Sequence, residues 1–319
     1  MKHSNKVQND LENSKSFQKV ALFVTRIRKD EKAIIKALES AGIEVVPIFD
    51  KEIFFSLENN PKDTQQFDLL LERSINHARA LYTLEICEKY NIPTINNTKT
   101  AQNCGNKFLL IQELNKSSIQ TPKAALTFTK ESAIQTIKDD FTFPIVLKPA
   151  IGSWGRLLAK ANDWDAAHAI LGHKKMLGSY HHSVFYLEEF IKKTAEYKIL
   201  VMNKKAICAV KREASCWASH RDPEEKITKI PLTNLPKELI EIAQNAAIAI
   251  KGDIVAVDIL EKSKSEEENN SSNYYVIDID YTVEFHAYFK EDIEKIMQEL
   301  VTLVKSKLGS IKIKVNSNE

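Results

Sequence analysis

Glycine is scarce in this sequence, which has eight among its 319 residues, whereas average usage would give about 22. Each glycine is therefore expected where the backbone has a specific need for it. Two of the eight, Gly152 and Gly155, lie three residues apart. The four cysteines form no CxxC pair, which argues against a zinc site and a disulfide framework and predicts reduced, mostly buried thiols.

The chain also lacks long apolar runs and an excess of charge of one sign. No run approaches the roughly 20 apolar residues that cross a bilayer, and the polar N-terminal segment has no secretory signal. Lysine and arginine (45) nearly balance aspartate and glutamate (43), so charge gives no argument for nucleic-acid binding. We expect a cytoplasmic protein with neither a membrane nor a nucleic acid as partner.

Strand-like and helix-like segments alternate over the first third of the chain, beginning with the β-branched run Val20–Val24. This alternation predicts a small parallel α/β domain. From Tyr197 onward the pattern changes to antiparallel strands, with a short turn at Asn203–Lys204. The fold class is therefore α/β with α+β elements. The expected regions are a disordered leader (1–18), an N-terminal α/β domain (19–98), a central subdomain (99–187), a C-terminal antiparallel subdomain (188–308) and a tail (309–319).

The most informative local segment is VLKPAIGSWGR, residues 146–156. Lys148 ends an apolar strand, and Pro149 prevents that strand from continuing. The following loop, with two glycines, a serine and an arginine, is able to turn backbone N–H groups toward phosphate oxygens beside the lysine charge. It is not a Walker A loop, because GxxxxGK[ST] is absent. A plain strand–helix turn with an exposed lysine is the alternative.

A second signal is acidic. Asp278 and Asp280 alternate in the apolar segment VIDID, so both side chains point to one face of a strand. Asp258 lies in another apolar segment, VAVDILE, and is close to both if the two strands pair. Three neighbouring carboxylates repel each other unless a cation neutralises them, and oxygen ligands of this kind suit Mg²⁺. A solvated acidic strand edge is the alternative.

Two weaker signals lie between these segments. Glu188 and Glu189 end a predicted strand, with Glu196 shortly after, and such a turn is able to receive the adenine and ribose of a nucleotide. Arg212 ends the strand-like segment ICAVKRE, where an arginine would reach a transferred phosphoryl group. Taken alone, a charged surface turn and a solvated strand end explain these residues equally well.

In their order along the chain, these parts resemble the ATP-grasp carboxylate–amine ligases, and among them the RimK/LysX family. The segment GSWGRL is especially characteristic of that family, and the resemblance extends from Val20 to Leu308. The stretches that carry it are RSINHARAL (73–81), IPTINN (92–97), CGNK (104–107), TPKAALTF (121–128), VLKPAIGSWGRLLAKAND (146–163), VFYLEEFI (184–191) and VAVDILE (255–261).

The resemblance implies an ATP-grasp fold with an N-terminal Rossmann-like pre-ATP-grasp domain, and an ATP-dependent carbon–nitrogen ligase that uses ATP and two Mg²⁺ ions. In such enzymes a carboxylate attacks the γ-phosphate to give an acyl phosphate, and an amine then displaces the phosphate. The ATP ligands implied by position are Lys107, Lys148, Gly152, Ser153, Trp154, Gly155, Arg156, Glu188, Glu189, Glu196 and Lys198.

The other roles implied by the resemblance concern the metal, the catalytic step and the substrates. The resemblance implies that Asp258, Asp278 and Asp280 bind the metal, and that Arg212 and Lys148 stabilise the transferred phosphate. Three further residues are candidates for binding a substrate, although the two arginines among them equally fit a fold-stabilising role at the surface. They are Arg73, Arg79 and Glu284.

The branch that this chain most resembles acts in lysine and arginine biosynthesis, where it joins the C-terminal glutamate of a small acidic LysW-type carrier protein to α-aminoadipate or glutamate. The resemblance therefore predicts these partners and a homo-oligomer, either a dimer or a tetramer. Residues 217–226 lack the glycine-containing acceptor stretch of that branch, and Lys198 stands where its members have arginine. The alternatives are a RimK-type glutamate ligase, a paralogue with another acceptor amine, and a degenerate nucleotide-binding regulatory protein.

Overall fold

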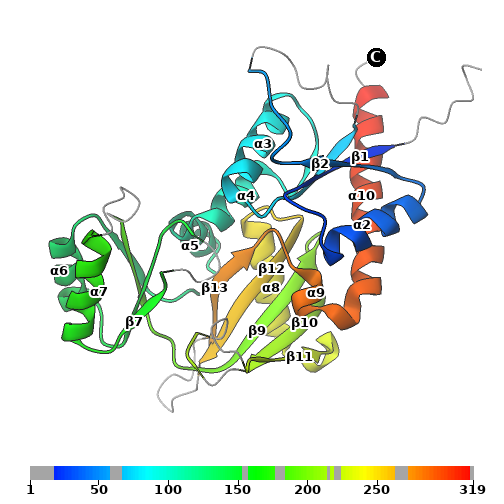
Figure 1. The fold of residues 1–319 in the computed structure, drawn as a ribbon. Coiled ribbons are helices and arrows are strands. Elements are labelled where there is room, and N and C mark those ends of the chain that lie inside the picture. The colour runs from blue at the N-terminus through cyan, green and yellow to red at the C-terminus, as the bar shows by residue number, and fades with distance from the viewer. Residues whose placement is uncertain are drawn as a thin grey trace, which may run out of the picture.

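The computed structural model describes residues 18–57, 67–152, 157–176, 184–213, 216–218, 224–262 and 272–316. These residues form three sheets, one in each of three regions that follow one another along the chain (Figure 1). Nearly all of the predicted leader lies outside the described residues.

The N-terminal sheet is parallel, with strand order β2-β1-β3-β4, which confirms the predicted parallel α/β domain. Its two central strands are runs of apolar residues that are buried on both faces, as expected for a covered parallel sheet. The elements of this region are β1 (Lys19–Val24), α2 (Lys29–Ser40), β2 (Glu44–Phe49), β3 (Leu69–Arg73), α3 (His77–Lys89), β4 (Thr94–Ile95) and α4 (Thr98–Gly105).

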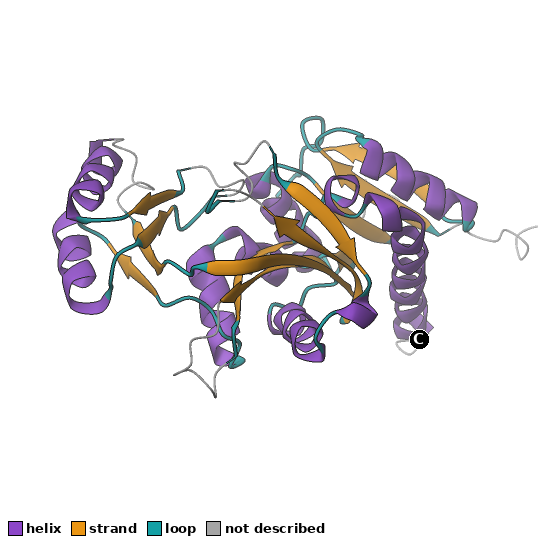
Figure 2. Cartoon of the chain, turned by 90° about the horizontal axis from the view of Figure 1, so that it is seen from below, coloured by secondary structure: helices purple, strands orange, loops and turns teal. Residues whose placement is uncertain are grey.

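The central subdomain is an antiparallel sheet of order β5-β8-β6-β7 with α6 and α7 against it. It has a hydrophobic core of its own and stands apart from the rest of the molecule in both ribbon views (Figures 1 and 2). Because β8 belongs to this sheet, the sheet extends to Glu189, beyond the predicted limit at residue 187. The elements are α5 (Lys107–Lys116), β5 (Ala124–Thr127), α6 (Lys130–Asp140), β6 (Ile145–Lys148), β7 (Ala159–Ala161), α7 (Trp164–Met176) and β8 (Phe185–Glu189).

The C-terminal sheet is antiparallel, with order β11-β10-β9-β12-β13. The predicted turn at Asn203–Lys204 is confirmed, and both residues have positive φ angles (46° and 65°), as a tight hairpin requires. The final helix continues to Asn316, beyond the expected start of the tail at residue 309. The elements are β9 (Lys193–Met202), β10 (Lys205–Glu213), β11 (Lys226–Ile230), η4 (Leu232–Asn234), α8 (Lys237–Ala249), β12 (Ile254–Lys262), β13 (Tyr274–Asp280), α9 (Phe285–Tyr288), η5 (Lys290–Asp292) and α10 (Ile293–Asn316).

The N-terminal domain and the C-terminal sheet form one packed body. Residues of β1, α2, β9, β10 and α10 share a single hydrophobic cluster. The buried side chain of Asn96 connects the same two regions, since it donates to the carbonyls of Ile254 and Tyr281 and accepts from the backbone N–H of Asp253. A shared core therefore fixes the N-terminal domain and the C-terminal sheet relative to each other, and the central sheet faces this body.

Candidate active site

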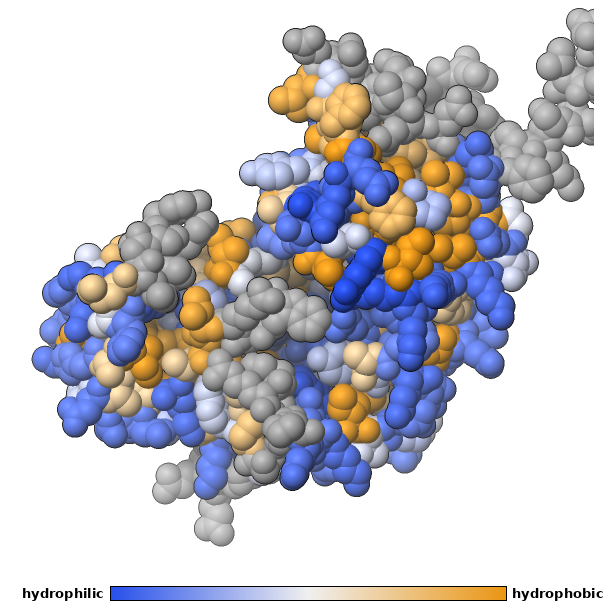
Figure 3. All heavy atoms as spheres, in the orientation of Figure 1, coloured by the Kyte–Doolittle hydropathy of each residue, from blue (hydrophilic) through white to orange (hydrophobic). Residues whose placement is uncertain are grey.

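Two cavities lie between these regions, and residues of β13 line both of them. The larger cavity, of about 310 Å³, is bounded by the N-terminal domain, β9, β10, β12 and β13. The smaller cavity, of about 120 Å³, lies between the central sheet and the C-terminal sheet. In the space-filling view, strongly hydrophilic side chains gather where the N-terminal domain meets the C-terminal part (Figure 3).

The smaller cavity has mainly apolar walls, with charged groups at one end. Ile277 of β13 and Val146 of β6 contribute apolar surface. At the charged end, Nζ of Lys148 lies 2.5 Å from Oε1 of the buried Glu188. The predicted hinge residues Glu188, Glu189 and Glu196 all line this cavity together with Lys148. An apolar slot that ends in a lysine is suited to an aromatic base and its phosphates.

An aromatic wall of the smaller cavity was not predicted. Trp217 lines the cavity, and its ring meets that of Phe190 edge to face, with 6.2 Å between the centroids. The ammonium group of Lys160 lies 4.8 Å from the Phe190 centroid. Phe190 directly follows the Glu-Glu pair, so its place at the hinge could have been inferred; the approach of Trp217 depends on tertiary packing.

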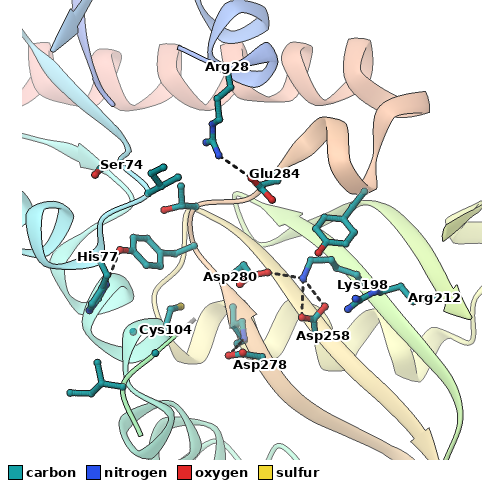
Figure 4. A pocket seen from close by; sticks show the side chains of 18 residues that line it. Arg28, Ser74, His77, Cys104, Lys198, Arg212, Asp258, Asp278, Asp280 and Glu284 are labelled. Carbon is teal, nitrogen blue, oxygen red and sulfur yellow. Dashed lines mark hydrogen bonds and ion pairs between the residues drawn. The ribbon is translucent and has the colours of Figure 1, made fainter. Parts of the chain in front are cut away.

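In the larger cavity, Lys198 lies between two of the predicted metal ligands (Figure 4). Its Nζ atom is 2.7 Å and 2.9 Å from the two carboxylate oxygens of Asp258, and 2.7 Å from Oδ2 of Asp280. The ring of Tyr288 lies on another side of the ammonium group, 4.8 Å away. Burial lowers the pKa of Lys198, but the two carboxylates outweigh this effect and raise it, so the lysine is a permanent cation.

The third aspartate, Asp278, pairs with a different lysine. Nζ of Lys107 is 3.2 Å from Oδ2 of Asp278 and 3.5 Å from the carbonyl oxygen of Gly152. Burial raises the pKa of Asp278, but the charges of Lys107 and Lys148 outweigh burial and lower it. The glycine loop is also held by the backbone, because the N–H of Lys107 donates to the carbonyl of Ala150 at 2.8 Å. Lys107 thus joins the start of the glycine loop to Asp278, and the charge of Lys148 also acts on this carboxylate.

Arg212 connects the two cavities. Its Nη1 donates to Glu196 at 2.7 Å and its Nε donates to Glu225 at 2.6 Å. The remaining nitrogen, Nη2, is buried and has no hydrogen-bond partner among the described residues. Since Arg212 lines the larger cavity, this unsatisfied donor is suited to an anion that enters there.

The aspartates fit Mg²⁺ in their chemistry but do not form a preformed cage. Asp258, Asp278 and Asp280 line the same cavity, as the strand pattern predicted, and Asp258 and Asp278 are direct cross-strand partners. However, no group of three acidic, histidine or cysteine side chains in the described part of the chain is arranged to hold a metal. The three carboxylates lie in one cavity, but each has a cation as its partner: Lys198 pairs with Asp258 and Asp280, and Lys107 pairs with Asp278. Their role as metal ligands stays a prediction. Mg²⁺ commonly uses one or two carboxylates together with phosphate oxygens and water, so these residues suit an ion that arrives with a nucleotide.

The two arginines predicted to bind a substrate have structural contacts instead. Arg73 is 4% exposed, donates to Glu31 and to the carbonyl of Val283, and lines neither cavity. Arg79 pairs with Asp50 at 2.8 Å and also lies outside both cavities. Of the two explanations given for these arginines, stabilisation of the fold is the one that their contacts support.

Glu284, the third predicted substrate residue, does line the larger cavity. Its partner is an arginine that the sequence reasoning missed: Nη1 of Arg28 donates to Oε1 of Glu284 at 2.9 Å. A signal for Arg28 was present, because it follows the buried strand β1, and side chains after the carboxyl ends of parallel strands often meet at a ligand site. The flap residues Ser153, Trp154, Gly155 and Arg156, and residues 219–223 of the altered acceptor stretch, lie outside the described residues.

Comparison with known proteins agrees with this geometry. The model of the LysX preATP-grasp domain matches residues 20–103, and the model of the RimK-like ATP-grasp domain matches residues 104–304. The chain belongs to the RimK-like ATP-grasp family. It is therefore an ATP-dependent carbon–nitrogen ligase, as the resemblance predicted.

Several relatives of this ligase have curated names. An α-aminoadipate–LysW ligase LysX of Sulfolobus acidocaldarius is 30% identical over 74% of this chain and 85% of its own length. A glutamate–LysW ligase ArgX of the same organism is 27% identical over 90% of this chain and 98% of its own. A coenzyme γ-F420-2:α-L-glutamate ligase of Methanocaldococcus jannaschii is 26% identical over 70% and 78%.

Solved structures confirm the ATP-grasp fold. A RimK domain ATP-grasp protein of Sphaerobacter thermophilus superposes with a TM-score of 0.73 at 20% identity, covering 89% of this ligase and 98% of that chain. A D-alanine–D-alanine ligase of Bacillus anthracis has a TM-score of 0.65 at 16% identity, with 93% and 99% covered. ATP-grasp ligases use ATP and typically Mg²⁺, in agreement with the predicted cofactors. Every helix in the described ranges is too short or too polar to cross a membrane.

Proposed function

We propose that this ligase joins the side-chain carboxylate of the C-terminal glutamate of a LysW-type carrier protein to the amino group of α-aminoadipate or glutamate. The relatives named for LysW ligation align over most of the chain and support the carrier and the amino-dicarboxylate. The observation that carries the proposal is the pair of adjoining cavities, one suited to a nucleotide and one, with both cations and carboxylates, suited to the two reacting substrates.

ATP would lie with its adenine in the smaller cavity, beside Glu188 and Glu189, and with its ribose near Glu196. Its phosphates would extend past Lys148 toward Lys107, beneath the loop that begins at Gly152. These lysines are partly shielded from water, with 11% and 13% of their side chains exposed, so their charges act on phosphate with little screening. Mg²⁺ bound with the phosphates by Asp258, Asp278 and Asp280 would neutralise their charge.

The reaction would take place at the junction of the cavities. The carrier carboxylate attacks the γ-phosphate, giving an acyl phosphate and ADP, and the amine then displaces phosphate to leave an amide. Arg212 would donate from Nη2, which has no partner among the described residues, to the transferred phosphoryl group, and Lys148 would add its charge from the smaller cavity. Because no covalent intermediate with the protein is needed, positioning and charge stabilisation account for the catalysis.

Product formation with defined substrates tests this proposal. ADP release would be measured with glutamate and with α-aminoadipate, each with and without a LysW-type carrier. The proposal expects turnover only when the carrier and one of these amino acids are both present. Turnover without the carrier would instead indicate a RimK-type ligase acting on another substrate, and nucleotide binding without any turnover would indicate a regulatory protein. A homo-oligomer stays a prediction of the resemblance.

A further inference from the structure

The pair formed by Arg28 and Glu284 lines the larger cavity on the side of the N-terminal domain (Figure 4). Arg28 is contributed by the loop between β1 and α2, and Glu284 by the segment between β13 and α9. Both side chains line the cavity and are partly accessible, with 17% and 28% exposed. In the close view, the guanidinium of Arg28 points toward Glu284 from the N-terminal domain, and Lys198 and Asp258 lie on the other side (Figure 4).

The guanidinium of Arg28 is held in place from behind. Its Nε and Nη2 donate to the two carboxylate oxygens of Glu31, both at 2.9 Å, in a bidentate arrangement. Glu31 is fully buried and also accepts from Nε of Arg73 at 3.1 Å. Because Glu31 holds one edge of the guanidinium, the remaining edge points in a defined direction, here toward the cavity. The structural arginine Arg73 thus positions Arg28 through Glu31.

Glu284 is less constrained than Arg28. Its Oε1 accepts the bond from Arg28, and the Glu284 side chain has no other hydrogen bond or ion pair with the part of the chain that the structure describes. Burial raises its pKa, so this carboxylate is a better proton acceptor than an exposed glutamate. The cavity therefore ends in a fixed cation in contact with a carboxylate that has an oxygen to spare.

We propose that Arg28 and Glu284 form the subsite for the acceptor amino acid, with Arg28 binding its α-carboxylate and Glu284 its α-amino group. This inference rests on the proposed function and names the residues that select the amine. An α-amino acid carries an anion and a cation on one carbon atom, which complements a cation and an anion in direct contact. The amino acid would insert into the Arg28–Glu284 ion pair, so that each charge exchanges one partner for another.

Glu284 also provides a path for the proton that the amine must lose. The bound ammonium group transfers one proton to the Glu284 carboxylate and becomes a neutral amine. The amine nitrogen then forms a bond to the acyl carbon, the bond from that carbon to the phosphate oxygen breaks, and the second proton leaves with the phosphate as hydrogen phosphate. The proton on Glu284 returns to solvent after the product leaves, so the carboxylate is restored.

Hydroxylamine makes it possible to test this subsite separately from the first half-reaction. It is a small neutral nucleophile that traps an acyl phosphate and has neither an α-carboxylate nor an ammonium group to bind. With the carrier and ATP, hydroxamate formation reports the first half-reaction, and amide formation with glutamate or α-aminoadipate reports both halves. The variants are Arg28→Met and Glu284→Gln, with Arg28→Lys to retain the charge if Arg28→Met does not fold. Matched controls are Arg26→Met, an exposed arginine in the same loop, and Glu291→Gln, an exposed glutamate in a neighbouring segment.

The inference predicts that Arg28→Met raises KM for the amino acid by about 10- to 100-fold, the effect of losing a charged hydrogen bond. Glu284→Gln should lower kcat for the amide by a similar factor, and hydroxamate formation should change less than about twofold in both. Converting the α-carboxylate of the amino acid to a neutral amide should raise KM of the wild type but change KM of Arg28→Met little, because that variant has no cation to pair with the carboxylate. Arg28→Lys should still discriminate against the amide, but less than the wild type does. If Arg28 had a purely structural role, the amide would raise KM of the wild type and of Arg28→Met by the same factor.

Two results would overturn the inference. If the wild type forms hydroxamate and amide but the variants lose both in parallel, Arg28 and Glu284 support the fold and do not bind the amine. If the variants keep the wild-type KM and kcat, the amino acid binds elsewhere. A wild type that forms neither product would instead contradict the proposed function itself, so the two failures are distinguishable.

Discussion

The side chain of Lys198 neutralises Asp258 across two neighbouring strands. These residues are direct partners in the pairing of β9 with β12, and the ammonium group also reaches Asp280 on β13. One lysine thus binds two carboxylates that were predicted to face a metal ion alone. Its charge also offsets the carboxylate of Asp280.

Replacement of Lys198 should therefore destabilise the fold. Lys198→Met leaves Asp258, which is 8% exposed, without its cation, and breaking a buried pair from one side costs about 3–5 kcal/mol. Asp280→Asn should cost less than about 1 kcal/mol, because the side chain of Asp280 is 48% exposed and Lys198 keeps its bonds to Asp258. Denaturant unfolding of both variants checks this order. Equal losses would contradict this account, because they would assign the stabilising effect of Lys198 to Asp280 instead of the buried Asp258.

Removal of Lys148 should weaken nucleotide binding. Lys148→Met deletes a charge at the phosphate end of the smaller cavity, and we expect Kd for ATP to rise by about 10- to 100-fold in titration calorimetry. Lys123→Met is a suitable control, since that lysine is an exposed residue paired with Asp140. An unchanged Kd in Lys148→Met would contradict the placement of the phosphates.

A change at Arg212 should affect turnover and leave nucleotide binding intact. Arg212→Lys keeps the charge but loses the unpartnered Nη2, so we expect kcat to fall by about 100-fold or more. Kd for ATP should stay within about threefold of the wild type, because the arginine acts on the phosphoryl group in the transition state. Lys211→Met, the preceding residue, serves as control. A fall in nucleotide affinity that matches the fall in kcat would place Arg212 in ground-state binding instead.

Glu72 should make stability depend on pH. Burial raises its pKa to about 8, although Ser74 and Thr282 hydrogen-bond to it. A carboxyl group with a raised pKa stabilises the fold fully below its unfolded pKa, near 4.5, and this stabilisation is lost as pH rises toward 8. Glu72→Gln removes the titration and retains donor and acceptor atoms. Its free energy of unfolding relative to wild type should increase by about 2–4 kcal/mol from pH 5 to pH 8. A difference that does not vary with pH would show that Glu72 is ionised in the fold.

Local pattern sufficed for much of the fold. The buried run Val20–Val24, the hairpin at Asn203–Lys204 and the alternation in VIDID each predict structure within a few residues, and each is confirmed. The position of Lys198 was not predictable in this way, because it depends on the register between strands that lie about 60 residues apart. A lysine in place of the family arginine was visible in the sequence; its carboxylate partners were not.

The arginines likewise show which features of the site the sequence predicts and which it does not. The resemblance offered Arg73 and Arg79 as candidates for binding a substrate, with stabilisation of the fold as the alternative. The structure places Arg28 at the cavity because the buried Glu31 holds both Arg28 and Arg73, and only Arg28 has an edge directed outward. Which of two strand-end arginines faces a cavity depends on a buried partner that sequence periodicity does not identify.

Transfer of oxygen from carboxylate to phosphate tests the central claim most directly. The C-terminal glutamate of a LysW-type carrier would be labelled with ¹⁸O in its side-chain carboxylate, and the phosphate released with ATP and glutamate or α-aminoadipate would be analysed by mass spectrometry. If the carboxylate attacks the γ-phosphate, each phosphate released alongside amide carries one labelled oxygen. Amide formation with unlabelled phosphate would contradict the acyl-phosphate route and, with it, the proposal that ATP in the smaller cavity meets the two substrates of the larger cavity at their junction.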